Sequence, residues 1–187
     1  MKFIPQAIPD VQLIRLERRE DERGFFARFW CETEFPKQGL DARVSQINTQ
    51  VSKVAGTLRG MHYQKPPHAE VKTVRCVRGA IFDVAVDLRP DSPTFRRWVG
   101  ATLTAENADM FYVPEGFAHG YLTLKPDTEV LYLTSVPYAP AAATGVRFDD
   151  PAFAIRWPRE VTVVSAVDRS WPDFVPDSVP DSVPDSV

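Results

Sequence analysis

The chain has 187 residues, of which 44% are hydrophobic and 25% charged, which is enough for one well-buried domain and too little for two. Its formal net charge of -3 gives no electrostatic reason to expect nucleic acid or an anionic membrane as a partner, so an anionic ligand would need a local cluster of Arg and Lys. Cys31 and Cys76 form no CxxC pattern, and no apolar run is long enough to span a bilayer. We therefore expect a single soluble, cytoplasmic domain without disulfide bonds.

The distribution of proline and glycine favours strands over helices. Seventeen prolines and nine glycines separate short stretches that are rich in Val, Phe, Thr and Tyr, so few windows allow a long helix. One short helix is predicted at residues 32–39, ended by Gly39. Strands are predicted at residues 11–17, 25–30, 71–78, 80–88, 98–103, 110–113, 121–124 and 130–136. Many short strands between Gly/Pro turns are typical of an all-β sandwich or jelly roll.

The clearest alternation of apolar and polar residues runs over positions 80–88. It predicts one core face, and it puts Asp83, Asp87 and Arg89 on the other face. The preceding predicted strand, 71–78, is connected to it through a turn at Gly79.

A lysine shares the side of core residues in that preceding strand. Lys72 has the same parity as Val74 and Cys76. Either its stem is covered while its ammonium reaches out past the rim of the sheet, or the ammonium points into the mouth of a barrel.

A strand-like run at residues 56–64 carries a histidine three positions after an arginine. Gly56 and Gly60 let the backbone bend or approach a ligand closely. His62 is then a candidate for proton transfer, because an imidazole titrates near neutral pH, and Arg59 is a candidate for binding an anion. The alternative is a core histidine and an arginine that caps a sheet edge.

The three histidines of the chain, His62, His68 and His119, are candidates for a metal set. Residues 114–119 resemble the second motif of the cupin superfamily, whose jelly-roll barrels often bind a metal. The first cupin motif needs two histidines separated by one residue and a glutamate a few positions on, whereas His62 and His68 are six positions apart and Glu70 follows His68 too closely. The set is incomplete, so we expect no metal and no cofactor.

Four motifs, at residues 59–64, 86–95, 113–120 and 149–158, occur in the order in which they occur in the nucleotide-sugar 3,5-epimerase family, typified by dTDP-4-dehydrorhamnose 3,5-epimerase. The chain resembles this metal-independent cupin family from about residue 4 to residue 171. The resemblance implies a double-stranded β-helix (jelly roll) and a homodimer. It also implies inversion of C3, C5 or both in a nucleotide-diphosphate 4-keto-6-deoxy sugar, without a cofactor.

The resemblance also implies roles for individual residues. His62 matches the catalytic base, Asp168 the carboxylate that orients it, and Tyr132 the acid on the opposite face of the sugar ring. Lys72 matches a lysine near the ketone oxygen. Without the resemblance, Tyr132 would be read as an aromatic residue of the barrel core. The residues that match substrate-binding positions are Arg23, Gln46, Asn48, Arg59, His119 and Tyr138.

Three positions depart from the family pattern. Arg28, Ala143 and Val167 stand where members acting on the dTDP sugar commonly carry Glu, Glu and Lys, at positions expected near the ligand. A changed base preference, or inversion at C3 or C5 alone, fits these departures equally well. Two functions from other classes also remain: a non-catalytic sugar-nucleotide-binding cupin, and a metal-dependent cupin isomerase or oxygenase.

The C-terminal residues repeat the tetrapeptide Val-Pro-Asp-Ser. The epimerase domain is expected to cover residues 1–172. Residues 173–187 have no amphipathic period and a proline every four positions, so they are expected to be disordered or bound to a surface, with no chemistry of their own.

Overall fold

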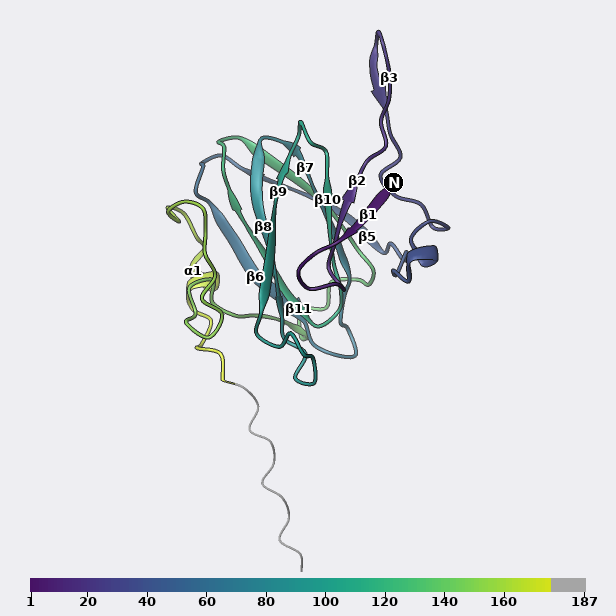
Figure 1. Cartoon of the computed structure of the whole chain (residues 1–187). Helices are drawn as coiled ribbons and strands as arrows, with labels where there is room; N and C mark the ends of the chain where they lie inside the picture. Colours follow the sequence, from purple (N-terminus) through teal and green to yellow (C-terminus); the bar gives the residue numbers. More distant parts are fainter. Residues whose placement is uncertain (176–187) are drawn as a thin grey trace, which may run out of the picture.

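The computed structural model describes residues 1–175 and consists of two facing antiparallel sheets (Figure 1). The larger sheet has the order β1 (Lys2–Pro5), β2 (Gln12–Arg15), β10 (Met110–Val113), β7 (Lys72–Arg78), β12 (Thr128–Thr134), β5 (Gln46–Ser52). The smaller sheet has the order β13 (Ala143–Gly145), β6 (Leu58–Gln64), β11 (Phe117–Thr123), β8 (Ala80–Asp87), β9 (Trp98–Thr104). The predicted all-β jelly roll is confirmed.

The main core lies between the two sheets. Val74 of β7 and Phe111 of β10 from the larger sheet meet Ile81 and Ala85 of β8 from the smaller one, and all four are fully buried. Because side chains alternate along a strand, the same faces carry polar groups into the interior wherever the apolar residues stop. One end of this interior is the cavity described below.

The prediction of one apolar and one polar face for strand β8 is wrong, because both faces are buried. Ile81 and Ala85 point into the main core, while Val84 and Val86 pack under the C-terminal segment, together with Phe153. A strand that is covered on both sides cannot leave its polar residues in water. Asp83 and Asp87 are accordingly fully buried, and each is hydrogen-bonded to neighbouring side chains.

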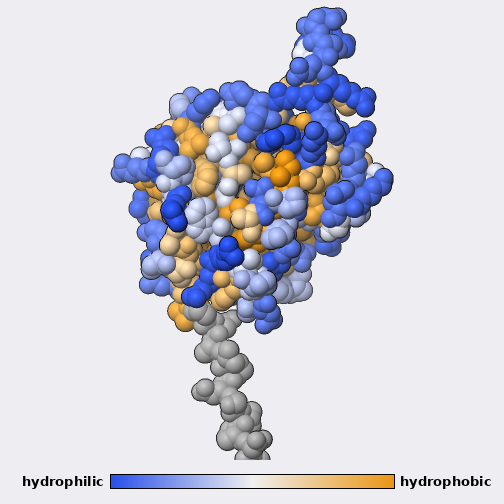
Figure 2. All heavy atoms as spheres, viewed as in Figure 1, coloured by the Kyte–Doolittle hydropathy of each residue, from blue (hydrophilic) through white to orange (hydrophobic). Residues whose placement is uncertain are grey.

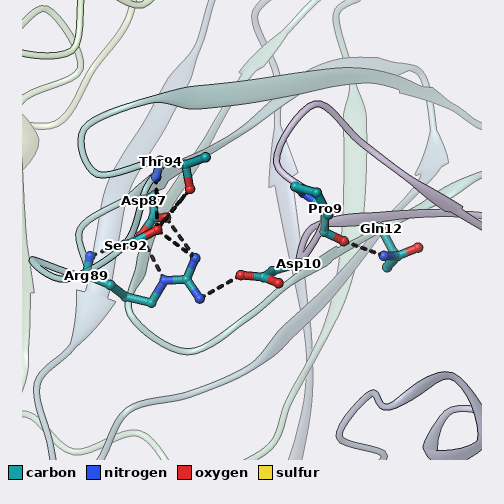
Figure 3. Close-up of polar contacts among 7 residues, drawn as sticks. All are labelled: Pro9, Asp10, Gln12, Asp87, Arg89, Ser92 and Thr94. Atoms are coloured by element: carbon teal, nitrogen blue, oxygen red, sulfur yellow. Dashed lines mark hydrogen bonds and ion pairs between the residues drawn. The ribbon is translucent and has the colours of Figure 1, made fainter.

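Asp87 ties the loop between β8 and β9 to the N-terminal turn (Figure 3). Its carboxylate accepts hydrogen bonds from Arg89 at 2.8 and 2.9 Å, from Ser92 at 2.5 Å and from Thr94 at 2.6 Å. The guanidinium of Arg89 also lies 2.7 Å from the carboxylate of Asp10. A buried carboxylate with this many donors replaces the water that it has lost.

Several predicted boundaries differ from the observed ones. The predicted strand 11–17 is shorter, as β2. The predicted strand 25–30 is only β4 (Gly24–Phe26), and the predicted helix 32–39 is a 3-10 turn, η1 (Pro36–Gln38), that ends at Gly39 with a φ of 73°. Strand β11 begins at Phe117, so His119 lies on a strand and not in the predicted turn at residues 114–120.

A hairpin formed by β3 (Arg19–Asp21) and β4 projects from the body at the top of Figure 1. The projecting end is mostly hydrophilic in Figure 2, yet Phe25 and Phe26 on β4 are 47% and 65% exposed. The hairpin makes no sheet pairing with the body among the described residues.

The end of the described chain runs along the outer side of the smaller sheet. The short helix α1 (Ala166–Arg169) lies beside β6. Beyond it, the backbone N–H of Phe174 donates to Asp150 at 2.6 Å, and the Phe174 ring packs against Phe153. The tail predicted at residues 173–187 lies outside the described residues from residue 176 onward. Within residues 1–175, no helix has the length and apolar character that crossing a bilayer requires.

Candidate active site

A cavity of about 640 Å³ opens between the two sheets, where the apolar core gives way to polar residues. Strands β5, β7 and β12 form one wall, β6 and β11 form the other, and β13 and α1 lie at the rim. The sequence-predicted residues that line it are Gln46, Asn48, Arg59, His62, Lys72, His119, Tyr132 and Tyr138.

Asp168 lies behind His62 and binds its imidazole. Nε2 of His62 is 2.6 Å from Oδ1 of Asp168, and the side chain of His62 is 48% exposed while that of Asp168 is 7% exposed. Helix α1 holds the carboxylate in place, since the Ser165 hydroxyl accepts the backbone N–H of Asp168 at 3.0 Å. With Nε2–H donating to a carboxylate, Nδ1 is the ring nitrogen that carries the lone pair.

The carboxylate of Asp168 is favoured in its charged form. Burial alone would raise its pKa, but the hydrogen bond from His62, the charge of His62 and the backbone N–H of Gly60 outweigh burial, and the pKa is lowered. The N–H of Gly60 is 3.4 Å from Oδ2. An ionised partner fixes the tautomer of the imidazole and the orientation of its ring.

A close backbone approach places two histidines side by side. Gly60 has a φ of 137°, and a Cβ at this position would lie 2.5 Å from the Cα of Gly120. The glycine therefore allows β6 to approach β11, and His62 stands opposite His119 in the register of these strands. Nε2 of His119 is 2.6 Å from the buried carboxylate of Asp83.

Tyr132 lies on the opposite wall, on β12 of the larger sheet. It pairs with Val74 of β7 on one side and with Asn48 of β5 on the other. Burial raises the pKa of its phenol, the charge of Glu70 raises it further, and the charge of Arg59 acts in the opposite direction. The phenol is therefore protonated at neutral pH.

Lys72 is next to Tyr132 on the same sheet and does not reach out past the rim. Its ammonium is 2.6 Å from the carboxylate of Glu70, and the two side chains are only 11% and 10% exposed. Nζ also donates to the backbone carbonyl of His62 at 3.4 Å. The cavity thus contains a buried ion pair beside the phenol.

The remaining polar residues form hydrogen bonds with the backbone and side chains at the wall and at the mouth of the cavity. Arg59 donates to the hydroxyl of Ser52 at 3.1 Å and to the carbonyl of Val51 at 3.2 Å, which fixes its guanidinium at the wall. The side-chain oxygen of Gln46 accepts the backbone N–H of Tyr138 at 2.9 Å. Tyr138 itself is 64% exposed at the mouth.

Two residues expected near the ligand lie elsewhere in the described chain. Arg23 is at the tip of the β3–β4 hairpin, with its side chain 83% exposed and its guanidinium 2.6 Å from Asp21. Arg28 pairs with Glu34 at 2.9 Å and does not line the cavity. Of the three departures from the family pattern, Ala143 and Val167 do line it.

Sequence reasoning did not select several residues of the cavity, among them Gln50, Glu70, Tyr121 and Trp171. The Tyr121 hydroxyl donates to Gln50 at 2.9 Å, and Trp171 lies at the rim, where its ring packs on Gly145. Glu70 is two positions before Lys72 and therefore has the same parity, a signal that predicts the same wall. Trp171 follows the strands in an irregular segment, so no period pointed to it.

The described residues contain no group of three or more His, Cys, Asp or Glu side chains arranged to hold a metal ion. His62 and His119 are each bound to one aspartate, and these aspartates come from different elements. The nitrogen and oxygen atoms that could bind a metal are thus divided between two separate His–Asp pairs.

Residues 5–175 match the family described as dTDP-4-dehydrorhamnose 3,5-epimerase. A protein of that name from Sinorhizobium fredii is 45% identical over 173 residues, which are 92% of this chain and 89% of that protein. A dTDP-4-dehydrorhamnose 3-epimerase from Streptomyces niveus is 38% identical over 170 residues, which are 90% of this chain and 82% of the relative.

The fold is similar to that of a solved family member. The crystal structure of dTDP-4-dehydrorhamnose 3,5-epimerase from Bacillus anthracis, with TDP and PPi bound, matches with a TM-score of 0.89 at 39% identity, covering 92% of this chain and 99% of that one. Together with the sequence matches, this fold similarity identifies the chain as a member of the dTDP-4-dehydrorhamnose 3,5-epimerase family, a family of isomerases.

Proposed function

We propose that this protein inverts C3 and C5 of a 4-keto-6-deoxy sugar carried on dTDP, and that proton transfer between His62, Tyr132 and the sugar performs the inversion. The main support for this proposal is the placement of the two groups. An imidazole bound to a buried carboxylate and a protonated phenol come from opposite sheets and line the same cavity. An inversion needs a base on one face of the carbon and an acid on the other.

His62 acts as the base in this scheme. The ketone at C4 acidifies the C–H bonds at C3 and C5, and Nδ1 of His62 takes the proton from one face. The electron pair of the broken C–H bond moves into a C=C bond, and the ketone oxygen becomes an enolate. Asp168 stabilises the imidazolium that forms, because its carboxylate is already charged.

Tyr132 acts as the acid. As the enolate collapses back to the ketone, the carbon takes a proton from the phenol on the opposite face, which leaves the carbon inverted. The imidazolium of His62 then releases its proton to solvent and the tyrosinate takes one up, which returns both groups to their starting state. The raised pKa of Tyr132 supports this role, since an acid must hold its proton until the carbanion-like carbon is presented to it.

The remaining polar residues of the cavity bind the substrate and stabilise the enolate in this scheme. Lys72 donates to the developing enolate oxygen, and Arg59, with its guanidinium fixed at the wall, pairs with the diphosphate. Asn48, Gln46 and His119 hydrogen-bond the substrate. Tyr138, exposed at the mouth, stacks on the nucleotide base.

The protein is proposed to work as a homodimer in which each β3–β4 hairpin reaches the other subunit. Arg23 is not near the cavity of its own chain, and the hairpin that carries it projects into solvent with Phe25 and Phe26 exposed. Ile47 and Val51 on the edge strand β5 are also exposed, so apolar surface is present at an open sheet edge. A second copy that covers these residues would bring Arg23 to a diphosphate.

Deuterium exchange tests the proposal. The protein is incubated in D₂O with the dTDP 4-keto-6-deoxy sugar, and NMR follows label at C3 and C5 together with the configuration of each carbon. Label at both carbons with inversion is expected, and it should persist after treatment with a chelator. Absence of all label would show that the protein is a non-catalytic binding module. Activity that is lost in chelator and restored only by added metal would show that it is a metal-dependent cupin.

A second candidate is inversion at C3 alone. The Streptomyces niveus relative is named as a 3-epimerase, and Ala143 and Val167 change the cavity lining where other members carry charged residues. The same NMR experiment separates the two, because a 3-epimerase inverts C3 and leaves the configuration at C5 unchanged.

A further inference from the structure

Glu70 is a carboxylate in the wall of a cavity that is proposed to stabilise an anion. Its side chain lines the cavity, is 10% exposed and lies 2.6 Å from Nζ of Lys72. A negative charge near a developing enolate opposes the reaction, and burying it costs free energy unless it is paired. The position of Glu70 therefore requires a reason other than direct contact with the substrate.

The ion pair and the hydrogen bond of Lys72 supply that reason. An ammonium has three N–H donors. Among the described residues, the ammonium forms an ion pair with Glu70 at 2.6 Å and donates one hydrogen bond to the backbone carbonyl of His62 at 3.4 Å. These two contacts fix the position of the ammonium and leave it donor capacity for a ligand.

The bond to His62 also links the lysine to the base. Nζ of Lys72 is bound to the backbone of the residue whose side chain is held by Asp168. A flexible four-carbon side chain whose ammonium is held by these two contacts is preorganised, so it does not lose further rotational freedom when the substrate enters.

We propose that Glu70, in the epimerase reaction proposed above, is a positioning residue that holds the Lys72 ammonium so that its free N–H meets the enolate oxygen. Glu70 itself transfers no proton. Its carboxylate also offsets the cost of burying the ammonium, whose side chain is 11% exposed.

The charge of Glu70 has a second effect, on Tyr132. Burial is the main cause of the raised pKa of Tyr132, and the negative charge of Glu70 adds to it. The other titratable or charged groups around this site are Lys72 on β7, Arg59, His62 and Tyr63 on β6, His119 and Tyr121 on β11, and Tyr138 at the mouth, with Asp83 and Asp168 behind the two histidines. Arg59 opposes the effect of Glu70, so removing the carboxylate lowers the pKa of the phenol.

Two variants separate the contact of Glu70 with Lys72 from the negative charge of Glu70. In Glu70→Ala the ammonium loses its anchor, and kcat should fall by about 10- to 100-fold, the cost of misplacing a catalytic group, with little change in KM. In Glu70→Gln the amide oxygen still accepts from Nζ, so most of kcat near neutral pH should return. The alkaline limb of the pH profile of kcat/KM should move to lower pH, because Tyr132 has lost the negative charge beside it.

Glu129 provides the matched control. It lies on the strand of Tyr132, outside the cavity, and its carboxylate is 3.4 Å from Arg78. Glu129→Ala and Glu129→Gln should leave kcat and the alkaline limb unchanged. Thermal unfolding of every variant is measured alongside. If Glu70→Ala does not fold, the alkaline limb of the isosteric Glu70→Gln decides.

Wild-type kcat in Glu70→Ala, equal impairment of the Ala and Gln variants at every pH, or an unmoved alkaline limb in Glu70→Gln would each overturn this role. These outcomes are distinct from failure of the proposed reaction. Wild-type protein that exchanges no deuterium removes the epimerase function, whereas exchange in the wild type with unaltered Glu70 variants removes only the role of Glu70.

Discussion

The imidazole of His62 and the carboxylate of Asp168 are separated by 106 positions in the sequence and by 2.6 Å in the structure. One end of this pair is a strand of the smaller sheet and the other is a single turn of helix near the end of the described chain. The imidazole that is proposed as the base therefore depends on helix α1, Ala166–Arg169, for its hydrogen-bond partner.

Replacing Asp168 with Asn is expected to lower kcat by about 10²- to 10⁴-fold, the range that general base catalysis supplies. The amide keeps the shape of the side chain but removes the negative charge that stabilises an imidazolium. Deuterium exchange at C3 and C5 gives the measurement. The control is Asp149→Asn, which removes an exposed carboxylate paired with Arg147 and should retain full activity. Unchanged exchange in Asp168→Asn would contradict the role of the pair.

Replacing Tyr132 with Phe should separate the two proton transfers. The variant keeps the ring and loses the acid, so His62 still removes the proton and exchanges it with D₂O on the same face, whereas inverted product forms slowly. NMR compares label incorporation with configuration at each carbon. Tyr112→Phe removes a hydroxyl that accepts the N–H of Asp41 away from the cavity and serves as the control. Equal loss of exchange and inversion in Tyr132→Phe would show that the phenol has a different role.

Mixing two inactive variants tests whether Arg23 acts across a dimer. Arg23→Ala and His62→Ala are each expected to be inactive, since the first loses a contact to the diphosphate and the second loses the base. Random pairing of equal amounts should restore about a quarter of the wild-type activity, because half of the dimers then contain one complete site. A mixture that remains inactive after subunit exchange would indicate that Arg23 serves its own chain.

Asp87 should give the protein an acid-sensitive stability. Burial alone would raise its pKa, but hydrogen bonds from Arg89, Ser92 and Thr94 lower it from the ordinary 3.8 to about 2. Because the folded-state value is the lower one, the stabilisation is complete above the unfolded-state value and is lost as pH falls from about 4 towards 2. The difference corresponds to about 2 kcal/mol.

Chemical denaturation of variants measures this contribution. Asp87→Asn should lower the free energy of unfolding at pH 7 by about 2 to 3 kcal/mol, because it leaves the Arg89 guanidinium without its buried carboxylate. It should also flatten the dependence on pH between 4 and 2. Asp91→Asn, at an exposed position of the same loop, should change neither quantity. Equal acid sensitivity in wild type and Asp87→Asn would exclude Asp87 as its source.

The sequence predicted the fold class and the family, because turn residues and strand periods are local and the motifs are specific. The parity of residues 71–78 also put Lys72 on the face of Val74 and Cys76, where the structure has it. The same reasoning gave the wrong environment to Asp83 and Asp87. A period of two distinguishes the faces of a strand, but it does not reveal that a distant segment covers the second face.

The tertiary contacts of the site could not be predicted from local sequence patterns. Which chain elements meet at His62 depends on long-range packing, so its pairing with Asp168 came only from the resemblance to a family. The location of Arg23 on a projecting hairpin is likewise a matter of tertiary structure. Glu70 carries a usable signal in the parity that it shares with Lys72.

His62 and Tyr132 stand on different sheets, so the gap between them is set by the thickness of the hydrophobic filling behind the cavity, where Val74, Ile81 and Phe111 pack. The size of these core side chains therefore sets the distance between the two groups. A core substitution to a smaller or larger side chain would change this distance and with it the size of sugar ring that fits between His62 and Tyr132. The substrate range of such a barrel can therefore change without any change in the residues that touch the sugar.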